Sequence, residues 1–174
     1  MFAASCETAT GSRKLAVVSQ SDLILQRREW KRNGKRVVCA VGVFDLLHPG
    51  HLRLLEQARA LGDILVVLVQ SDARAREEKG AGRPVTPATE RAEIVAALAA
   101  VDGAVELQNQ PAEGKFIAEL APDLLVLGAR TSPRKTSASR HDPPSALGIN
   151  VKEIPPEPGH STSRLIERVK QFRA

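Results

Sequence analysis

Three long apolar runs constrain the fold of this chain more than any other feature of its sequence. They are KRVVCAVGVF (35–44), DILVVLV (63–69) and DLLVLG (123–128), and their apolar residues do not alternate with polar ones. A strand with one solvated face alternates, whereas a strand inside a parallel sheet is covered on both faces and is continuously apolar. The runs therefore predict buried strands of a parallel sheet.

Segments with helical spacing lie before and between these strands. HLRLLEQARALG (51–62) has an apolar stripe that Gly62 ends. SQSDLILQRREWKRNG (19–34) predicts an earlier helix with Ser21 as its N-cap. Regular alternation of strand and helix predicts an α/β fold with a mostly parallel sheet and right-handed crossovers. The other predicted elements are helices at 89–100, 113–121 and 162–172 and short strands at 103–107 and 150–154.

Two segments depart from this alternation. Residues 129–148 (ARTSPRKTSASRHDPPSALG) are rich in Ser, Pro and Arg and predict a long mobile loop. Residues 1–14 are small and polar and predict a disordered leader. The remainder, 15–174, has the length of a single domain with its own core.

Composition limits the classes of partner. The net charge of +5 favours anionic partners, which include nucleic acid, a membrane surface and a phosphorylated small molecule. Aromatic residues make up only 3% of the chain, so stacking on single-stranded nucleic acid is not expected. No apolar run approaches the ~20 residues that span a bilayer, so no membrane partner is expected. Cys6 and Cys39 do not suggest a disulfide framework, which favours a reducing, cytoplasmic location.

Two of the four histidines, His48 and His51, lie together where the first long strand ends. In open α/β sheets, ligands bind beyond the carboxyl ends of strands and near helix N-termini. Pro49 suits the first position of a helix, and Gly50 allows a close approach to the backbone. Two imidazoles beside the free N–H groups of a helix start indicate an anion site, and a phosphate chain is one such anion.

Three other interpretations of this histidine pair stay open on residue types alone. The pair could be half of a zinc site, although no further Cys or His cluster has metal spacing. It could decorate the surface at a helix start. A Rossmann dinucleotide site is the third option, but no G-x-G-x-x-G follows the strand.

The wider pattern resembles a known family. GVFDLLHPGH (42–51), KGAGRPVTPATERAEIV (79–95) and HSTSRLIERV (160–169) resemble the motifs of the HxGH nucleotidyltransferase, or cytidylyltransferase-like, superfamily. Within it, the chain resembles the adenylyltransferase domain of ADP-heptose synthase. The resemblance runs from about Lys14 to Phe172, excluding the loop after Gly128. It implies a Rossmann-like nucleotidyltransferase fold with a mostly parallel five-stranded sheet flanked by helices, in a single domain at 15–174.

The resemblance also implies roles for individual residues. The implied cofactor is Mg²⁺ with no direct protein ligand, and Asp45 is expected either to orient the loop or to contact Mg²⁺ through water. Arg130 is the implied acceptor contact. The catalytic set is His48, His51, Lys79 and Arg91, with Lys79 on a mobile loop and Arg91 clamping a β- or γ-phosphate. The nucleotide-binding set is Gly42, Val43, Phe44, Asp45, Gly50, Gly128, Ser161 and Thr162.

The implied reaction joins a nucleoside triphosphate, ATP in preference to CTP, to a phosphorylated sugar such as heptose 1-phosphate, with release of pyrophosphate. One alternative is CTP-dependent transfer to glycerol 3-phosphate or a similar alcohol phosphate. Another is a non-catalytic nucleotide-binding regulator, because Leu127 replaces a lysine and Arg130 an aspartate of the heptose branch. Relatives of this family are commonly dimers, which makes a homodimer the implied assembly.

Overall fold

The structure is a computed structural model that describes residues 17–108, 112–128 and 148–172. The predicted leader (1–14) and residues 129–147 of the predicted loop, Arg130 among them, lie outside the described residues. Within the described ranges, no helix is long and apolar enough to cross a membrane.

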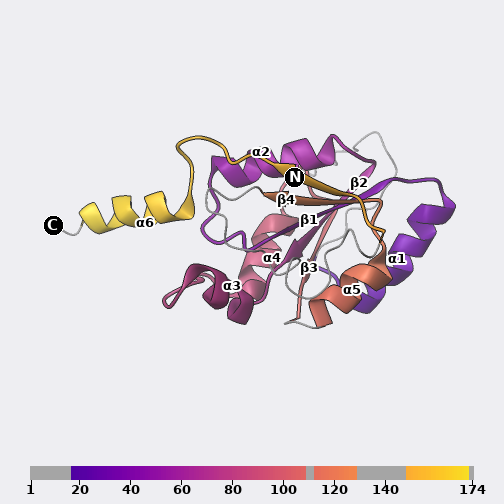
Figure 1. The fold of residues 1–174 in the computed structure, drawn as a ribbon, viewed down its shortest axis with the longest axis horizontal. Coiled ribbons are helices and arrows are strands. Elements are labelled where there is room, and N and C mark those ends of the chain that lie inside the picture. The colour runs from indigo at the N-terminus through magenta and orange to yellow at the C-terminus, as the bar shows by residue number, and fades with distance from the viewer. Residues whose placement is uncertain (1–16, 109–111, 129–147, 173–174) are drawn as a thin grey trace, which may run out of the picture.

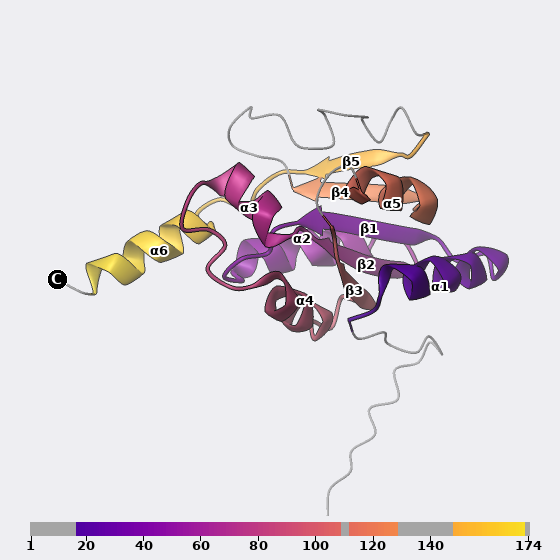
Figure 2. The same ribbon diagram turned by 90° about the horizontal axis from the view of Figure 1, so that it is seen from below.

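Five strands form one sheet in which every pair of neighbours is parallel. The order across the sheet is β3-β2-β1-β4-β5, so the chain starts in the middle and builds first one edge and then the other (Figures 1 and 2). The predicted α/β fold with a five-stranded parallel sheet is therefore confirmed. The strands are β1 (Val37–Gly42), β2 (Ile64–Val69), β3 (Gly103–Glu106), β4 (Leu124–Gly128) and β5 (Val151–Ile154).

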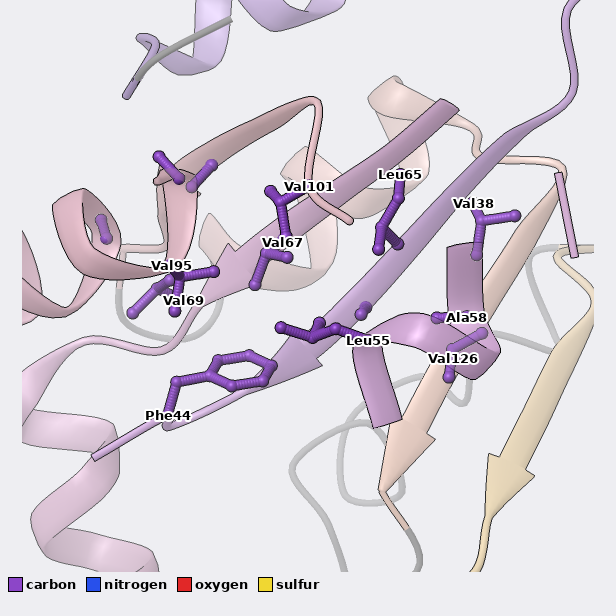
Figure 3. Close-up of a cluster of buried hydrophobic side chains, with 14 of the residues drawn as sticks. Val38, Phe44, Leu55, Ala58, Leu65, Val67, Val69, Val95, Val101 and Val126 are labelled. Atoms are coloured by element: carbon purple, nitrogen blue, oxygen red, sulfur yellow. The ribbon is translucent and has the colours of Figure 1, made fainter. Parts of the chain in front are cut away.

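Successive residues of β1 (Val37–Gly42) point to opposite faces and enter two separate cores. Val38 and Ala40 belong to the core that α2 and α4 cover, part of which Figure 3 shows around Phe44. Val37 and Cys39 belong to the core that α1 and α5 cover. Burial on both faces explains why this strand reads as a continuous apolar run. The helices are α1 (Gln20–Arg32), α2 (Pro49–Arg59), α3 (Asp72–Lys79), α4 (Ala88–Ala96), α5 (Ala112–Leu120) and α6 (Thr162–Gln171).

Two helices differ from the sequence-based expectation. The N-cap of α1 is Ser19, whose side chain accepts a hydrogen bond from the N–H of Asp22, and not Ser21. Helix α3 was not predicted, because its sequence DARAREEK buries only Ala75 and so carries no apolar stripe. Its start is fixed by Ser71, which accepts a hydrogen bond from the N–H of Arg74.

Helix α6 lies apart from the layers of the fold. It projects away from the sheet in both views, and none of its residues is buried (Figures 1 and 2). Its first turn lies near the carboxyl end of β1, because the hydroxyl of Thr162 donates to the carbonyl oxygen of Asp45 at 2.8 Å.

Candidate active site

Two neighbouring cavities open at the carboxyl ends of the central strands. The smaller, of about 190 Å³, is lined from β1, α3, α5 and β4. The larger, of about 820 Å³, lies between the starts of α2 and α6 and includes residues 154–164. The two cavities have a common set of lining residues, so they form one cleft with two chambers. The shared residues are His51, Leu54, Lys79, Arg83, Gly128 and Thr162.

The backbone between β1 and α2 is bent sharply at this cleft. Phe44 and Leu46 have φ angles of 52° and 47°, a left-handed conformation that is strained for residues with a Cβ atom. Phe44 is nevertheless buried, and its ring packs against His51 with 5.5 Å between ring centroids. A Cβ atom at Gly42 would lie 3.0 Å from the Phe44 ring, so the glycine makes room for this turn.

Asp45 joins three segments at the end of β1. Its carboxylate is 1% exposed and accepts hydrogen bonds from Arg83 Nε at 2.7 Å, Val85 N at 3.0 Å and Thr86 N at 3.1 Å. Its carbonyl oxygen holds Thr162 at the start of α6. Of the two predicted roles, orientation of the loop is the one that these contacts support.

His48 and His51 stack against each other at the start of α2. Their ring centroids are 3.9 Å apart and their planes differ by 23°. His48 is the N-cap residue of this helix. Pro49 takes the first helical position, as predicted. A Cβ atom at Gly50 would lie 2.9 Å from the His48 ring, so glycine is required for the ring to lie over the backbone. The Nδ1 atoms of both rings are buried without a hydrogen-bond partner among the described residues.

Both imidazoles are held in their neutral form. Burial lowers the pKa of His51 to about 3, and the neighbouring His48 and Lys79 add to this effect while Asp45 opposes it. Burial, and then the charge of His160, lowers the pKa of His48. Each ring therefore keeps one N–H donor at neutral pH without carrying a charge that would be costly to bury.

Two cations line both chambers. Lys79 is the last residue of α3, with Gly80 as the C-cap at a φ of 95°, so it stands on a helix end instead of the predicted mobile loop. Arg83 is held through its Nε by Asp45, and its side chain is 12% exposed. Arg83 was not among the predicted site residues, although it lies in the motif at 79–95 that carries the family resemblance.

Arg91 differs from its predicted role as a phosphate clamp. It is 1% exposed and lines neither chamber. Its Nε donates to the carbonyl of Thr86 at 2.9 Å, its Nη1 to the carbonyl of Val43, and its Nη2 to the carbonyl of Gln70 at 2.9 Å and to Asp72 at 2.7 Å. The guanidinium is thus an internal brace that ties the ends of β1 and β2 to α3 and to the loop before α4.

The remaining predicted residues lie around the cleft, apart from Arg130, which is outside the described residues. Val43 and Leu127 line the smaller chamber, and Ser161 lines the larger. Ser161 also caps α6 by accepting from the N–H of Arg164 at 3.2 Å. Besides Arg83, the lining residues that were not predicted include His160, whose motif was visible, and Gln70 and Glu113, for which the sequence gives no signal.

No metal centre is evident in the described part of the chain. No group of three or more His, Cys, Asp or Glu residues there is placed to hold an ion. Asp45, the carboxylate predicted to contact Mg²⁺ through water, already accepts hydrogen bonds from Arg83 and two backbone N–H groups. These side chains do not fit a direct Mg²⁺ site.

Comparison with known proteins agrees with this geometry. Residues 39–168 match the cytidylyltransferase-like family. The bifunctional protein HldE of Koribacter versatilis is 41% identical over 152 residues, which are 87% of this chain and 31% of that protein. HldE of Methylococcus capsulatus is 43% identical over 140 residues, which are 80% of this chain and 29% of that protein. The chain thus spans about a third of the length of these relatives.

A solved structure gives the same result. The crystal structure of the lipopolysaccharide core biosynthesis protein from Thermoplasma volcanium matches with a TM-score of 0.57 and 31% identity. The match covers 71% of this chain and 98% of that protein. The match at 39–168 contains the strand end, the histidine pair and the two cations, Lys79 and Arg83, that line both chambers. On this evidence the chain belongs to the cytidylyltransferase-like family.

Proposed function

We propose that this chain is a nucleotidyltransferase that joins ATP to a phosphorylated sugar and releases pyrophosphate. The observation that carries the proposal is the stacked, neutral pair of His48 and His51 at a helix start, with His51 on the boundary between two chambers. Family membership and the similarity to HldE support a nucleotidyltransferase that acts on a sugar phosphate. ATP and heptose 1-phosphate are the substrates that the resemblance to the adenylyltransferase domain of ADP-heptose synthase implies.

The larger chamber suits the nucleotide. It lies between the N-termini of α2 and α6, whose free N–H groups and dipoles favour phosphate oxygens. His48 and Gly50 from α2 and Ser161 and Arg164 from α6 line it. The smaller chamber, with its wall from α3 and α5, then receives the acceptor. Lys79 and Arg83 stand where the phosphates of the two substrates meet.

In this arrangement the reaction is a direct displacement. An oxygen of the acceptor phosphate attacks the α-phosphorus of the nucleotide, the bond from that phosphorus to the bridging oxygen breaks, and pyrophosphate leaves with the electron pair. The protein contributes position and electrostatics. The N–H groups of His48 and His51 donate to the oxygens on which charge develops, and Lys79 and Arg83 neutralise part of it. A Mg²⁺ ion, which would neutralise further charge, would arrive on the triphosphate.

The test is a panel assay of pyrophosphate release by the full chain. Each of ATP, CTP, GTP and UTP is combined with heptose 1-phosphate, a hexose 1-phosphate or glycerol 3-phosphate. We expect the fastest release with ATP and heptose 1-phosphate. Faster release with CTP and glycerol 3-phosphate would replace this proposal with the cytidylyltransferase alternative. Nucleotide binding without release on any acceptor would replace it with the regulator, which the leucine at position 127 would suit.

A further inference from the structure

The two chambers differ in the charge of the side chains that line them. The cations Lys79 and Arg83 line both chambers and so stand at their junction. Gln70, Glu78 and Glu113 line only the smaller one. An acceptor in that chamber would therefore have its phosphate at the cationic junction and its other end among hydrogen-bond acceptors.

Glu113 is an unusual residue for such a wall. It lies at the start of α5, and it is 3% exposed although it lines a cavity. A carboxylate is rarely buried to this degree, because removing it from water costs free energy. Its two oxygens accept several hydrogen bonds and donate none when ionised, so they suit the hydroxyl groups of a ligand.

Gln70 and Glu78 extend the polar wall from the other side. Gln70 is 6% exposed, and its amide nitrogen donates to Glu78 Oε1 at 3.2 Å. Arg74 pairs with the same oxygen at 3.1 Å, which fixes the carboxylate and, through it, the orientation of the Gln70 amide. The wall is therefore held in place before any ligand binds, and preorganised polar groups discriminate most strongly.

The rest of the chamber is apolar. Phe44, Ile117, Leu125 and Leu127 supply hydrophobic surface that fits the C–H faces of a sugar ring. A second phosphate in this chamber would lie against carboxylates and be repelled, and a compound with fewer hydroxyl groups would make fewer hydrogen bonds to this wall. The chamber thus matches a polyhydroxylated compound with a single phosphate.

We propose that Glu113 is a specificity-determining residue that accepts hydrogen bonds from acceptor hydroxyl groups and so selects a sugar monophosphate over glycerol 3-phosphate or a sugar bisphosphate. This inference rests on the proposed function, in that the smaller chamber is taken as the acceptor site. It concerns a residue for which the family motifs in this sequence provide no role.

The experiment compares Glu113→Gln with Glu119→Gln, an exposed glutamate on the same helix. Steady-state rates are measured for the full chain with ATP and a sugar 1-phosphate, with its deoxy analogues, and with glycerol 3-phosphate. Loss of a hydrogen bond to a charged group predicts that Glu113→Gln raises the KM for the sugar 1-phosphate about 10- to 100-fold. The KM for ATP and every constant of Glu119→Gln should stay at the wild-type value.

The deoxy series identifies the contact. For at least one deoxy analogue, kcat/KM in the unaltered chain should be about tenfold or more below the value for the sugar 1-phosphate. In Glu113→Gln the same analogue and the sugar 1-phosphate should have similar kcat/KM, because the contact is already absent. If no deoxy analogue is weakened in the unaltered chain, the inference is wrong whether or not the variant folds. If every deoxy analogue lowers kcat/KM by the same factor in the unaltered chain and in Glu113→Gln, the inference is also wrong.

A binding measurement separates this inference from the proposed function. If none of the sugar phosphates tested supports pyrophosphate release by the unaltered chain, the proposed function fails. Calorimetric titration with the sugar 1-phosphate alone then decides the inference, which requires that the unaltered chain binds the compound and that Glu113→Gln binds it about tenfold or more weakly. Equal binding by both, or no binding to the unaltered chain, would overturn it.

Discussion

The stacked imidazoles act through donor groups that are already in place, so their removal should cost rate and not stability. We predict that His48→Ala and His51→Ala each lower turnover by about 10²- to 10³-fold, the usual effect of losing one preorganised donor. Circular dichroism and melting temperature should match the unaltered chain. Pyrophosphate release within a factor of two of wild type in both variants would contradict the role of the pair.

The lowered pKa of His51, about 3 against an ordinary 6.5, has a consequence for stability. The unfolded chain binds a proton at this position as pH falls through 6.5, whereas the folded chain does so only near pH 3. The folded state therefore loses stability between these values as the solution becomes more acidic. We predict that the free energy of unfolding in urea falls less between pH 7 and pH 4 in His51→Gln than in the unaltered chain. If the free energy of unfolding changes equally with pH in the unaltered chain and in His51→Gln, the His51 ring is more hydrated than its burial indicates.

Arg91 of α4 and Asp45 both hold the loop between α3 and α4, and Arg91 also ties it to the ends of β1 and β2. Arg91→Ala leaves the carbonyls of Val43, Gln70 and Thr86 without this donor and Asp72 without its ion pair. We predict a loss of about 3–5 kcal/mol in the free energy of unfolding, measured with urea. Arg91→Lys should lose nearly as much, because an ammonium cannot reproduce the planar fork.

The exposed Arg28→Ala in α1 is the matched control for Arg91 and should be neutral. A stable Arg91→Ala protein with weakened nucleotide binding would restore the clamp role that the motif suggested.

Arg91 shows what the motif could and could not predict. It identified an arginine tied to the site, but it could not separate a residue that touches the ligand from one that braces the loop.

Helix α6 stands outside the body of the molecule, so its contribution to folding and to binding can be separated. Because none of its residues is buried, deletion of residues 163–174 should leave the melting temperature close to that of the full chain. The deletion removes the N–H groups at the helix start, so we predict about tenfold weaker ATP binding by calorimetry. Phe172→Ser, which keeps the helix start, should bind ATP normally. Normal ATP binding by the deletion variant would show that the helix start is not part of the nucleotide site.

A sequence predicts those elements best whose burial requires a regular pattern of apolar residues. The sheet was predictable because β1 and β2 are covered on both faces and are therefore uniformly apolar. Helix α3 was not, because a polar helix with one buried alanine leaves no periodic pattern. The same holds for the site: His48 and His51 lie in a contiguous motif, whereas Gln70 and Glu113 come together only when β2 and α5 are folded.

The two chambers are continuous, because they share lining residues, and this has a consequence for release of the product. A sugar nucleotide, the product of the proposed reaction, is a single molecule that fills both chambers at once. When either the nucleotide part or the sugar part dissociates, the part that is still bound holds the other near its chamber. The effective concentration there is high, in the millimolar range for short linkers. We therefore expect the product to bind more tightly than either substrate. Its departure, and not the making of the new bond, would then limit how often the enzyme turns over.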